Sequence, residues 1–242
     1  MNMQKILSTL RKAIQKYDLI QDGDRIAVGV SGGKDSLVLL KALSDFRKFN
    51  LFKFELFAVT IDIYSGEVSY DRLNEFCQEI DVPLIIEKTD IKHIVFDIRK
   101  EKNPCSLCAK MRRGALNSVC QRLQCNKLAL AHHLQDVVTT FFISLIYEGR
   151  LSTMLPKSYM SRSNITLIRP LYLTDEKNII SCSRNYPILK SRCPANNNSK
   201  RKEIKDFVRE IDQRFPKSRK RIETAILSSE SYNLLDKVNK DK

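Results

Sequence analysis

Six consecutive residues, Ser31-Gly32-Gly33-Lys34-Asp35-Ser36, have the composition of a loop that holds phosphate groups. They join an apolar run over 25–30, a predicted buried strand, to a leucine-rich predicted helix. Small residues let the backbone approach phosphate oxygens, and the N–H groups at a helix N-terminus attract an anion. Lys34 adds a positive charge, while Asp35 would orient the loop or help to hold a metal ion. The Walker motif is excluded, because it requires Ser or Thr where Asp35 stands.

A second chemical motif is the cysteine pair Cys105-Ser106-Leu107-Cys108, which follows Pro104 at the start of a predicted helix. The helix N-terminus and the cations Lys110, Arg112 and Arg113 would stabilise thiolates there. This spacing serves zinc, iron–sulfur and redox sites alike. A zinc site needs four ligands, and only Cys193 offers a further thiol in a loop-like, Pro-flanked context. Three thiolates leave one corner open, which suits a four-iron cluster whose unligated iron binds sulfide or a small substrate.

The remaining cysteines are expected to be structural. The chain has seven in all, an odd number that argues against a complete disulfide framework. Cys182 is the rival to Cys193 as a ligand, but its neighbours predict a buried helical position. The other three are interpreted as small apolar residues of helices or turns: Cys77, Cys120 and Cys125.

Charge points to a polyanionic partner. The 242 residues include 42 Lys and Arg against 28 Asp and Glu, a formal net charge of +14. Between 184 and 222, thirteen basic residues face four acidic ones. A solvated lysine-rich surface would have the same composition, but the concentration in one stretch favours nucleic acid. No apolar run approaches the length of a membrane span, and the first helix lacks the apolar centre of a secretory signal, so we expect a cytoplasmic protein.

Strands and helices alternate along the chain, which predicts an α/β fold with a doubly wound parallel sheet. An amphipathic helix over 1–20 and a basic C-terminal segment over 184–242 flank the central 21–183. Residues 90–107 interrupt the alternation as a polar, charged excursion over the sheet edge, and 150–164 are expected to form a loop. The predicted strands are 25–30, 55–61, 83–86, 127–131 and 165–169. The predicted helices are 36–46, 70–80, 109–122, 134–147 and 175–182, with a basic helix after 199.

The six-residue loop after a Val-rich strand resembles the pyrophosphate loop of the PP-loop ATPases, or N-type ATP pyrophosphatases. These enzymes cleave ATP between the α- and β-phosphates and adenylate a substrate. A bare Gly-Gly would suit an ordinary tight turn, whereas the full hexamer is specific. The strand 58–62 resembles the family's second strand, which implies that Asp62 lies beside the nucleotide.

The segment 130–136 resembles the family's His-His-x-Asp-Asp motif, with Gln135 at the first Asp position. The resemblance implies that His132 lies at the nucleotide and that Asp136 helps to place magnesium. Without the loop, His132 and His133 would be interpreted as packed polar residues at a strand end, since adjacent residues of a strand face opposite sides.

The run from Pro104 to Gly114 within such a chain resembles the tRNA 2-thiocytidine synthetase family. That family carries a [4Fe-4S] cluster on the two cysteines of this motif and a third from near the C-terminal end of the catalytic domain. The resemblance implies Cys105, Cys108 and Cys193 as ligands. Many members have a second CxxC, whereas this chain has one thiol there. The segment 168–177 also resembles the family.

The resemblance therefore implies an adenine nucleotide alpha hydrolase-like fold and an ATP-dependent tRNA sulfurtransferase. The C2 oxygen of an anticodon-loop cytidine, at position 32, would be adenylated and replaced by sulfur. ATP, Mg²⁺ and the cluster are the implied cofactors; tRNA and a cysteine desulfurase or other sulfide source are the partners, with room for a homodimer. The implied catalytic residues are Lys34, Asp35 and Asp136, and the implied cofactor-binding residues are Ser31, Gly32, Gly33, Lys34, Asp35, Ser36, Asp62 and His132.

Two alternatives remain open. A tRNA lysidine synthetase uses the same loop and similar chemistry on a cytidine, with lysine as the nucleophile, but has no use for three cysteines. A non-catalytic, zinc-containing RNA-binding protein would account for Gln135, but would leave the intact loop unexplained.

Overall fold

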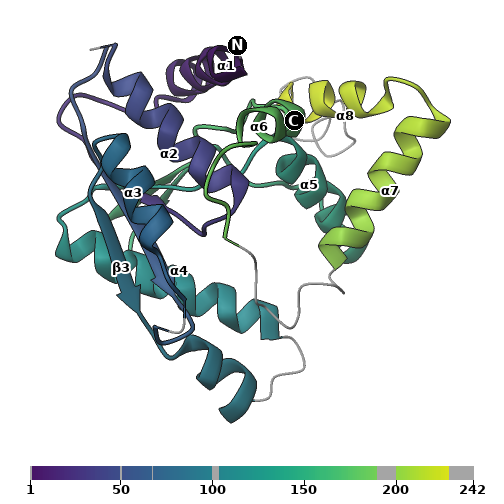
Figure 1. Ribbon diagram of the computed structural model, residues 1–242. Helices are drawn as coiled ribbons and strands as arrows, with labels where there is room; N and C mark the ends of the chain where they lie inside the picture. The colour runs from purple at the N-terminus through teal and green to yellow at the C-terminus, as the bar shows by residue number, and fades with distance from the viewer. Residues whose placement is uncertain (1, 50, 67, 100–103, 190–199, 229–242) are drawn as a thin grey trace, which may run out of the picture. The chain divides into compact units, whose positions relative to one another are not determined.

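The computed structural model describes residues 2–49, 51–66, 68–99, 104–189 and 200–228 (Figure 1). The chain divides into two compact units. The sheet unit comprises Met1–Gln135 and Leu155–Asn197, and the helical unit comprises Asp136–Met154 and Asn198–Lys242. None of the described helices is long and apolar enough to cross a membrane.

The sheet unit contains six strands in the order β3-β2-β1-β4-β6-β5. All neighbouring pairs are parallel except β5 with β6. In this register Val28 of β1 lies opposite Ala58 of β2 on one side and Ala129 of β4 on the other. The strand bounds are β1 Arg25–Gly29, β2 Glu55–Asp62, β3 Leu84–Lys88, β4 Lys127–Ala129, β5 Lys157–Met160 and β6 Ile165–Ile168.

Helices cover both faces of this sheet, as the doubly wound prediction requires. Along β1 the burial alternates, because Ile26 and Val28 join one apolar cluster and Ala27 joins the other. The first cluster includes residues of α1 (Asn2–Tyr17), α2 (Lys34–Arg47), α3 (Asp71–Glu79) and α6 (Glu176–Cys182). The second includes residues of the π-helix η1 (His93–Ile98) and of α4 (Pro104–Arg122).

Two local predictions were wrong. Residues 150–164 contain the edge strand β5, which has exposed Tyr159 and only four residues, too few for a recognisable alternation. The helix predicted to begin at about Ala109 begins instead at Pro104, which suits a first helical position because proline lacks the N–H that is unpaired there.

The helical unit is built from α5 (Leu134–Glu148, from Asp136 onward), α7 (Lys200–Arg214) and α8 (Ser218–Leu227). Phe142 of α5 packs edge-on against Phe207 of α7, with ring centroids 5.8 Å apart. Ile204 and Val208 form the buried stripe of α7. The carboxylate of Glu223, buried on α8, accepts a hydrogen bond from Arg219 Nε at 3.0 Å. The basic helix predicted after 199 is present as α7.

A buried ion pair ties β1 to β4 at their amino ends. Lys127 Nζ lies 2.5 Å from Asp24 Oδ2 and also donates to the carbonyl of Leu19 at 2.9 Å. Both charged side chains are almost fully buried. The Asp24 carboxylate accepts further hydrogen bonds from Gln21 N and Asn126 Nδ2. Its partners therefore lie both in the segment before β1 and next to the start of β4.

We predict that Lys127→Met destabilises the protein by about 3–5 kcal/mol, because it leaves the Asp24 carboxylate buried without its cation. The matched control is Lys157→Met, whose partner Asp18 is exposed and whose loss should cost less than about 1 kcal/mol. Urea denaturation measures both. Adding Asp24→Asn to the first variant should cost less than the sum of the two single changes. Equal losses in the two Lys variants would contradict a structural role for the pair.

Candidate nucleotide and metal site

The Ser31–Ser36 loop connects β1 to α2 and is braced by its own serines. Ser36 Oγ donates to the carbonyl of Gly33 at 2.9 Å, and Gly33 N donates to Ser31 Oγ at 3.3 Å. Gly33 is the extended N-cap of α2 and supplies no side-chain cap. The first N–H groups of α2 therefore point out of the helix end, where they favour an anion.

Gly32 occupies the left-handed region with φ +76°, and the chain at Leu189 packs directly against it. Leu189 N donates to the carbonyl of Gly32 at 2.9 Å. A Cβ built on Gly32 would lie 2.7 Å from Leu189 Cδ1 and 2.9 Å from its Cβ, so a side chain does not fit without backbone movement. Glycine is thus required twice, by conformation and by close packing.

A cluster of charged side chains lies at the start of α2. Lys34 Nζ donates to Asp35 Oδ1 at 2.7 Å and to Glu176 Oε1 at 2.9 Å. His133 Nε2, on a buried ring, lies 3.7 Å from the same Asp35 oxygen and 3.8 Å from the same Glu176 oxygen. Burial acts to lower the pKa of Lys34, but the hydrogen bonds that its ammonium donates to both carboxylates outweigh burial and raise that pKa above its ordinary value.

The donor set of this cluster fits a divalent cation. Ligand atoms of Asp35, His133 and Glu176 lie within 4.8 Å of one another. Mg²⁺ prefers carboxylate oxygens and phosphates, so Asp35 and Glu176 are the residues suited to hold it, and His133 is less suited. The Lys34 ammonium now lies between the two carboxylates. Binding of MgATP would therefore require Lys34 to exchange these carboxylates for phosphate oxygens.

Glu176 was missed by the sequence analysis as a site residue. It lies in the first turn of α6, the predicted helix over 175–182, whose N-cap Asp175 accepts a hydrogen bond from Lys177 N at 3.0 Å. An acidic residue at the start of a helix that follows a parallel strand was the available signal, since such helix starts lie at the carboxyl edge of the sheet.

The residues of the motif that follows β4 contact different groups. Gln135 Oε1 accepts a hydrogen bond from Glu176 N at 3.3 Å, so its amide helps to hold the start of α6 near the loop. His132 Nδ1 accepts from Arg169 Nε at 3.2 Å, which places the proton of a neutral ring on Nε2. His132 and His133 thus contact different groups.

Asp136 is the first residue of the helical unit. Its carboxylate oxygen Oδ1 lies 3.7 Å from Arg201 Nη2 and 3.7 Å from Lys205 Nζ, both on α7. The side chain is mostly buried, with 15% exposed. Asp136 therefore neutralises part of the basic helix, and its predicted part in placing magnesium stays a prediction.

Asp62, at the end of β2, is fully buried and organises the turn that follows. Its two oxygens accept hydrogen bonds from Tyr64 N at 2.9 Å and Gly66 N at 2.7 Å. Burial, followed by the charge of Asp62 and a hydrogen bond to it, raises the pKa of Tyr70 to about 12. Arg112 of α4 acts on the pKa of Tyr70 in the opposite direction. Cys108 and Met111 of the same helix pack against the core cluster that contains Ile61 of β2.

The cysteine pair occupies the first turn of α4. Cys105 is exposed and Cys108 is half-buried. Since α4 leads into the amino end of β4, its N-terminus lies toward the same carboxyl edge as the loop. Two thiols three positions apart on one helical turn suit ligation of one cluster. Cys193, the third predicted ligand, lies outside the described residues.

The other thiols are in structural settings, as predicted. Burial raises the pKa of Cys77 to about 11, of Cys120 to about 12 and of Cys125 to about 11. Cys182 packs beside the first core cluster, with its Sγ 3.8 Å from the hydroxyl of Tyr186. Burial, followed by Cys182, raises the pKa of Tyr186. These contacts support the interpretation of Cys182 as a packed helical residue.

Comparisons with known proteins identify the family of this chain. The family model described as "PP-loop domain" matches residues 3–214. A "tRNA-cytidine(32) 2-sulfurtransferase" of Citrifermentans bemidjiense is 36% identical over 240 residues, which cover 96% of this chain and 93% of that protein. A protein of the same name from Geobacter sulfurreducens is 35% identical over 238 residues, covering 96% and 93%.

Solved structures extend the comparison. The "U34-tRNA thiolase NcsA from Methanococcus maripaludis with its [4Fe-4S] cluster" superposes with a TM-score of 0.72 and 26% identity, covering 92% of this chain and 78% of that one. An NH3-dependent NAD synthetase from Campylobacter jejuni has a TM-score of 0.50 and 14% identity, covering 95% and 94%, and shows likeness of fold alone.

We predict that Gly32→Ala destabilises the protein and weakens ATP binding, because the new Cβ would displace Leu189 and strain a left-handed residue. Gly23→Ala is the matched control, since Gly23 has φ +80° and nothing within 4 Å of its Cβ position. The control should cost about 1–2 kcal/mol from backbone strain alone, and Gly32→Ala should cost more. Urea denaturation and ATP titration measure the two effects. Identical stability and unaltered ATP affinity would contradict the role of the close approach.

Proposed function

This chain belongs to the PP-loop domain family, and on that basis we propose that it is an ATP-dependent enzyme that replaces the C2 oxygen of a tRNA cytidine with sulfur. The curated relatives are named for this reaction at cytidine 32, and the thiolase NcsA is named with its [4Fe-4S] cluster. The resemblance to the tRNA 2-thiocytidine synthetase family, including the α/β fold, is therefore confirmed.

The observation that carries the proposal is the placement of two chemical motifs along one edge of the sheet. The pyrophosphate loop begins where β1 ends, and the CxxC turn of α4 lies toward the same edge, with Cys108 packed against the core cluster that contains Ile61 of β2. Ligands of open α/β sheets bind at this edge, where the strand order reverses between β1 and β4. An activating site and a sulfur-delivering site would thus face one substrate base.

In the proposed reaction, the C2 oxygen of cytidine attacks the α-phosphorus of ATP. A bond forms from that oxygen to phosphorus, and the bond to pyrophosphate breaks. The N–H groups of the loop would bind the departing pyrophosphate, with Lys34 released from its carboxylates to neutralise charge. Asp35 and Glu176 would hold Mg²⁺, which supplies further charge neutralisation. When sulfur bonds to C2, the adenylated oxygen leaves with AMP.

The proposed cluster ligands are Cys105, Cys108 and Cys193. A [4Fe-4S] cluster held by three thiolates supplies an iron atom that can bind sulfide. The described segment that leads to Cys193 reaches the pyrophosphate loop, because Leu189 hydrogen bonds to Gly32. This contact supports Cys193 over Cys182, whose thiol packs beside Tyr186 in the core.

The remaining parts of the functional assignment are also proposals. We propose a cytoplasmic enzyme that receives sulfur from a cysteine desulfurase or another sulfide source and that forms a homodimer. Residues 184–242 would hold the tRNA backbone, and residues 21–183 would carry out the chemistry. The names of the similar proteins favour a sulfurtransferase over the lysidine synthetase and the zinc-containing RNA-binding protein.

The first test is metal content. We predict about four irons per chain in anaerobically purified protein, and loss of iron and of tRNA thiolation in Cys193→Ala. Cys182→Ala is the matched control and should keep both. Iron analysis, absorption spectra and mass spectrometry of the nucleosides measure the outcomes. One zinc per chain, or iron retained in Cys193→Ala but lost in Cys182→Ala, would contradict the ligand set.

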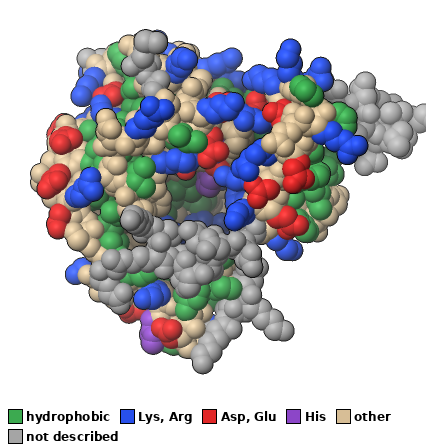
Figure 2. Space-filling model, turned by 45° about the vertical axis from the view of Figure 1, so that its right-hand side comes forward, with side chains coloured by type: hydrophobic (Ala, Val, Ile, Leu, Met, Phe, Trp, Pro, Cys, Tyr) green, Lys and Arg blue, Asp and Glu red, His purple; other side chains and the backbone are tan. Residues whose placement is uncertain are grey.

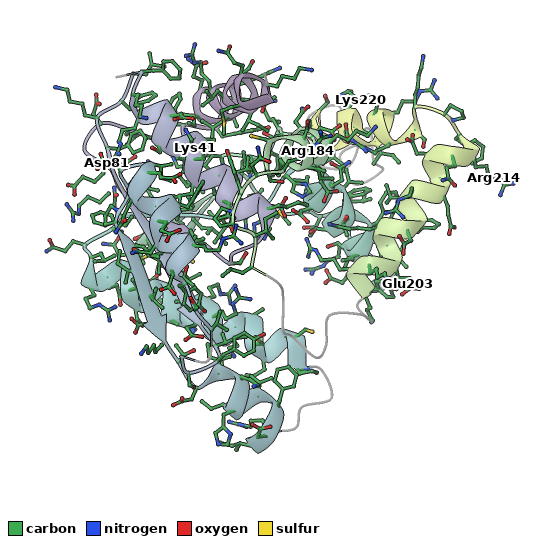
Figure 3. The ribbon with its side chains drawn as sticks, viewed as in Figure 1. Lys41, Asp81, Arg184, Glu203, Arg214 and Lys220 are labelled. Carbon is green, nitrogen blue, oxygen red and sulfur yellow. The ribbon has the colours of Figure 1, made fainter. Side chains whose placement is uncertain are left out.

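The exposed Arg214 of the basic helix α7 is suited to contact an RNA phosphate. Lys and Arg side chains are interspersed with Asp and Glu over the face in Figure 2, so charge alone does not mark one uniform surface. Arg214, at the end of α7, projects away from the helix (Figure 3) and is exposed. A side chain of this kind can reach an RNA phosphate without breaking a structural ion pair.

We predict that tRNA affinity falls steeply with ionic strength and that Arg214→Gln lowers the slope of log affinity against log salt by about 0.7–0.9, one phosphate contact. The matched control is Arg162→Gln, an exposed arginine of the β5–β6 turn, which should leave the slope unchanged. A flat salt response in the unaltered protein would count against α7 as part of the docking surface.

A further inference from the structure

Arg169 is a buried cation whose hydrogen-bond partners among the described residues are neutral. It follows β6 directly and is 9% exposed. Its Nε donates to His132 Nδ1 at 3.2 Å, and its Nη1 donates to the carbonyl of Leu155. Within the described part of the chain, no Asp or Glu forms an ion pair with this guanidinium. Two of its five N–H donors are used in these bonds.

A buried guanidinium without a counter-charge destabilises the folded protein unless an anion binds to it. A buried charge without a counter-charge loses its hydration, and a guanidinium cannot escape the cost by releasing its proton. Burial lowers the pKa of Arg169, and only Tyr172 acts to raise it. In a folded enzyme, a site of this kind is compensated when a negatively charged ligand binds.

The position of Arg169 indicates which anion. β6 pairs with β4, and β4 pairs with β1, whose end opens into the pyrophosphate loop. His132, which accepts from Arg169, is followed by His133, whose Nε2 is 3.7 Å from Asp35 of the loop. The guanidinium and the loop are therefore contacted by adjacent residues of the segment that follows β4. A phosphate adjacent to the pyrophosphate is the α-phosphate of ATP.

We infer that Arg169, oriented by His132, binds the α-phosphoryl group of ATP, the group that remains in AMP. This inference rests on the proposed function and adds a residue to it. The α-phosphoryl group gains negative charge as the base oxygen attacks, so a preplaced guanidinium stabilises that stage more than the ground state. The loop holds the pyrophosphate half of the nucleotide, and Arg169 holds the half that is transferred.

The test separates the two halves of ATP by measuring AMP and pyrophosphate binding independently, by calorimetry, on the full chain. Arg169→Met should weaken AMP binding by about 10- to 100-fold and change pyrophosphate binding less than twofold. The matched control Arg162→Met should change neither. Equal weakening of both ligands, or no effect on AMP, would overturn the inference. So would a loss of tRNA affinity with AMP binding intact, which would assign Arg169 to an RNA phosphate.

Substitution of His132 distinguishes a positioning role from general destabilisation. The Oδ1 of Asn can replace Nδ1 as the acceptor for Arg169, whereas Leu cannot. His132→Asn should bind AMP within a few fold of the unaltered protein, and His132→Leu should bind it about tenfold more weakly. If the Arg169→Met variant does not fold, the comparison of His132→Asn with His132→Leu still tests the inference. Equal AMP affinity in these two variants overturns it. Failure of the unaltered protein to bind pyrophosphate would instead refute the proposed use of ATP.

Discussion

The parallel pairing of β1 with β2 on one side and β4 on the other determines where every site residue lies. Each of these strands ends at the same edge, so the loop after β1, Asp62 at the end of β2 and the histidines after β4 lie along that edge although they are far apart in sequence. β6 adds Arg169 by the same rule. The buried pair of Asp24 and Lys127 fixes the opposite ends of β1 and β4. The chemistry depends on this register more than on any single side chain.

The fold and the loop could be predicted from the sequence because both are local signals. A Val-rich strand, a six-residue glycine loop and a Leu-rich helix follow one another without interruption. Glu176 and Arg169 could not be assigned in the same way, because their roles arise from contacts with residues 37 to 142 positions away. The short edge strand β5 was mispredicted for a related reason: one four-residue strand has no pattern of its own, and its pairing with β6 supplies the structure.

Positive charges are paired with carboxylates in a different way in each of the two units. In the sheet unit, Lys34 is held by two carboxylates, an arrangement that an incoming polyphosphate can exchange. In the helical unit, Asp136 lies between Arg201 and Lys205 of α7 and lowers the local positive charge of a helix that otherwise suits RNA. Both arrangements keep partly exposed cations oriented without a ligand. The cost of ordering them is thereby met during folding, before ligands bind.

Gln135 shows why a departure from a motif need not mean loss of function. A carboxylate at this position could accept the same hydrogen bond from Glu176 N, and Gln135 Oε1 accepts it as an uncharged group. The cluster of Asp35 and Glu176 already carries two negative charges against one Lys34 ammonium. A third carboxylate would raise the repulsion among them, whereas an amide keeps the start of α6 in place without adding charge. The substitution thus preserves the position of Glu176, on which the proposed cation site depends.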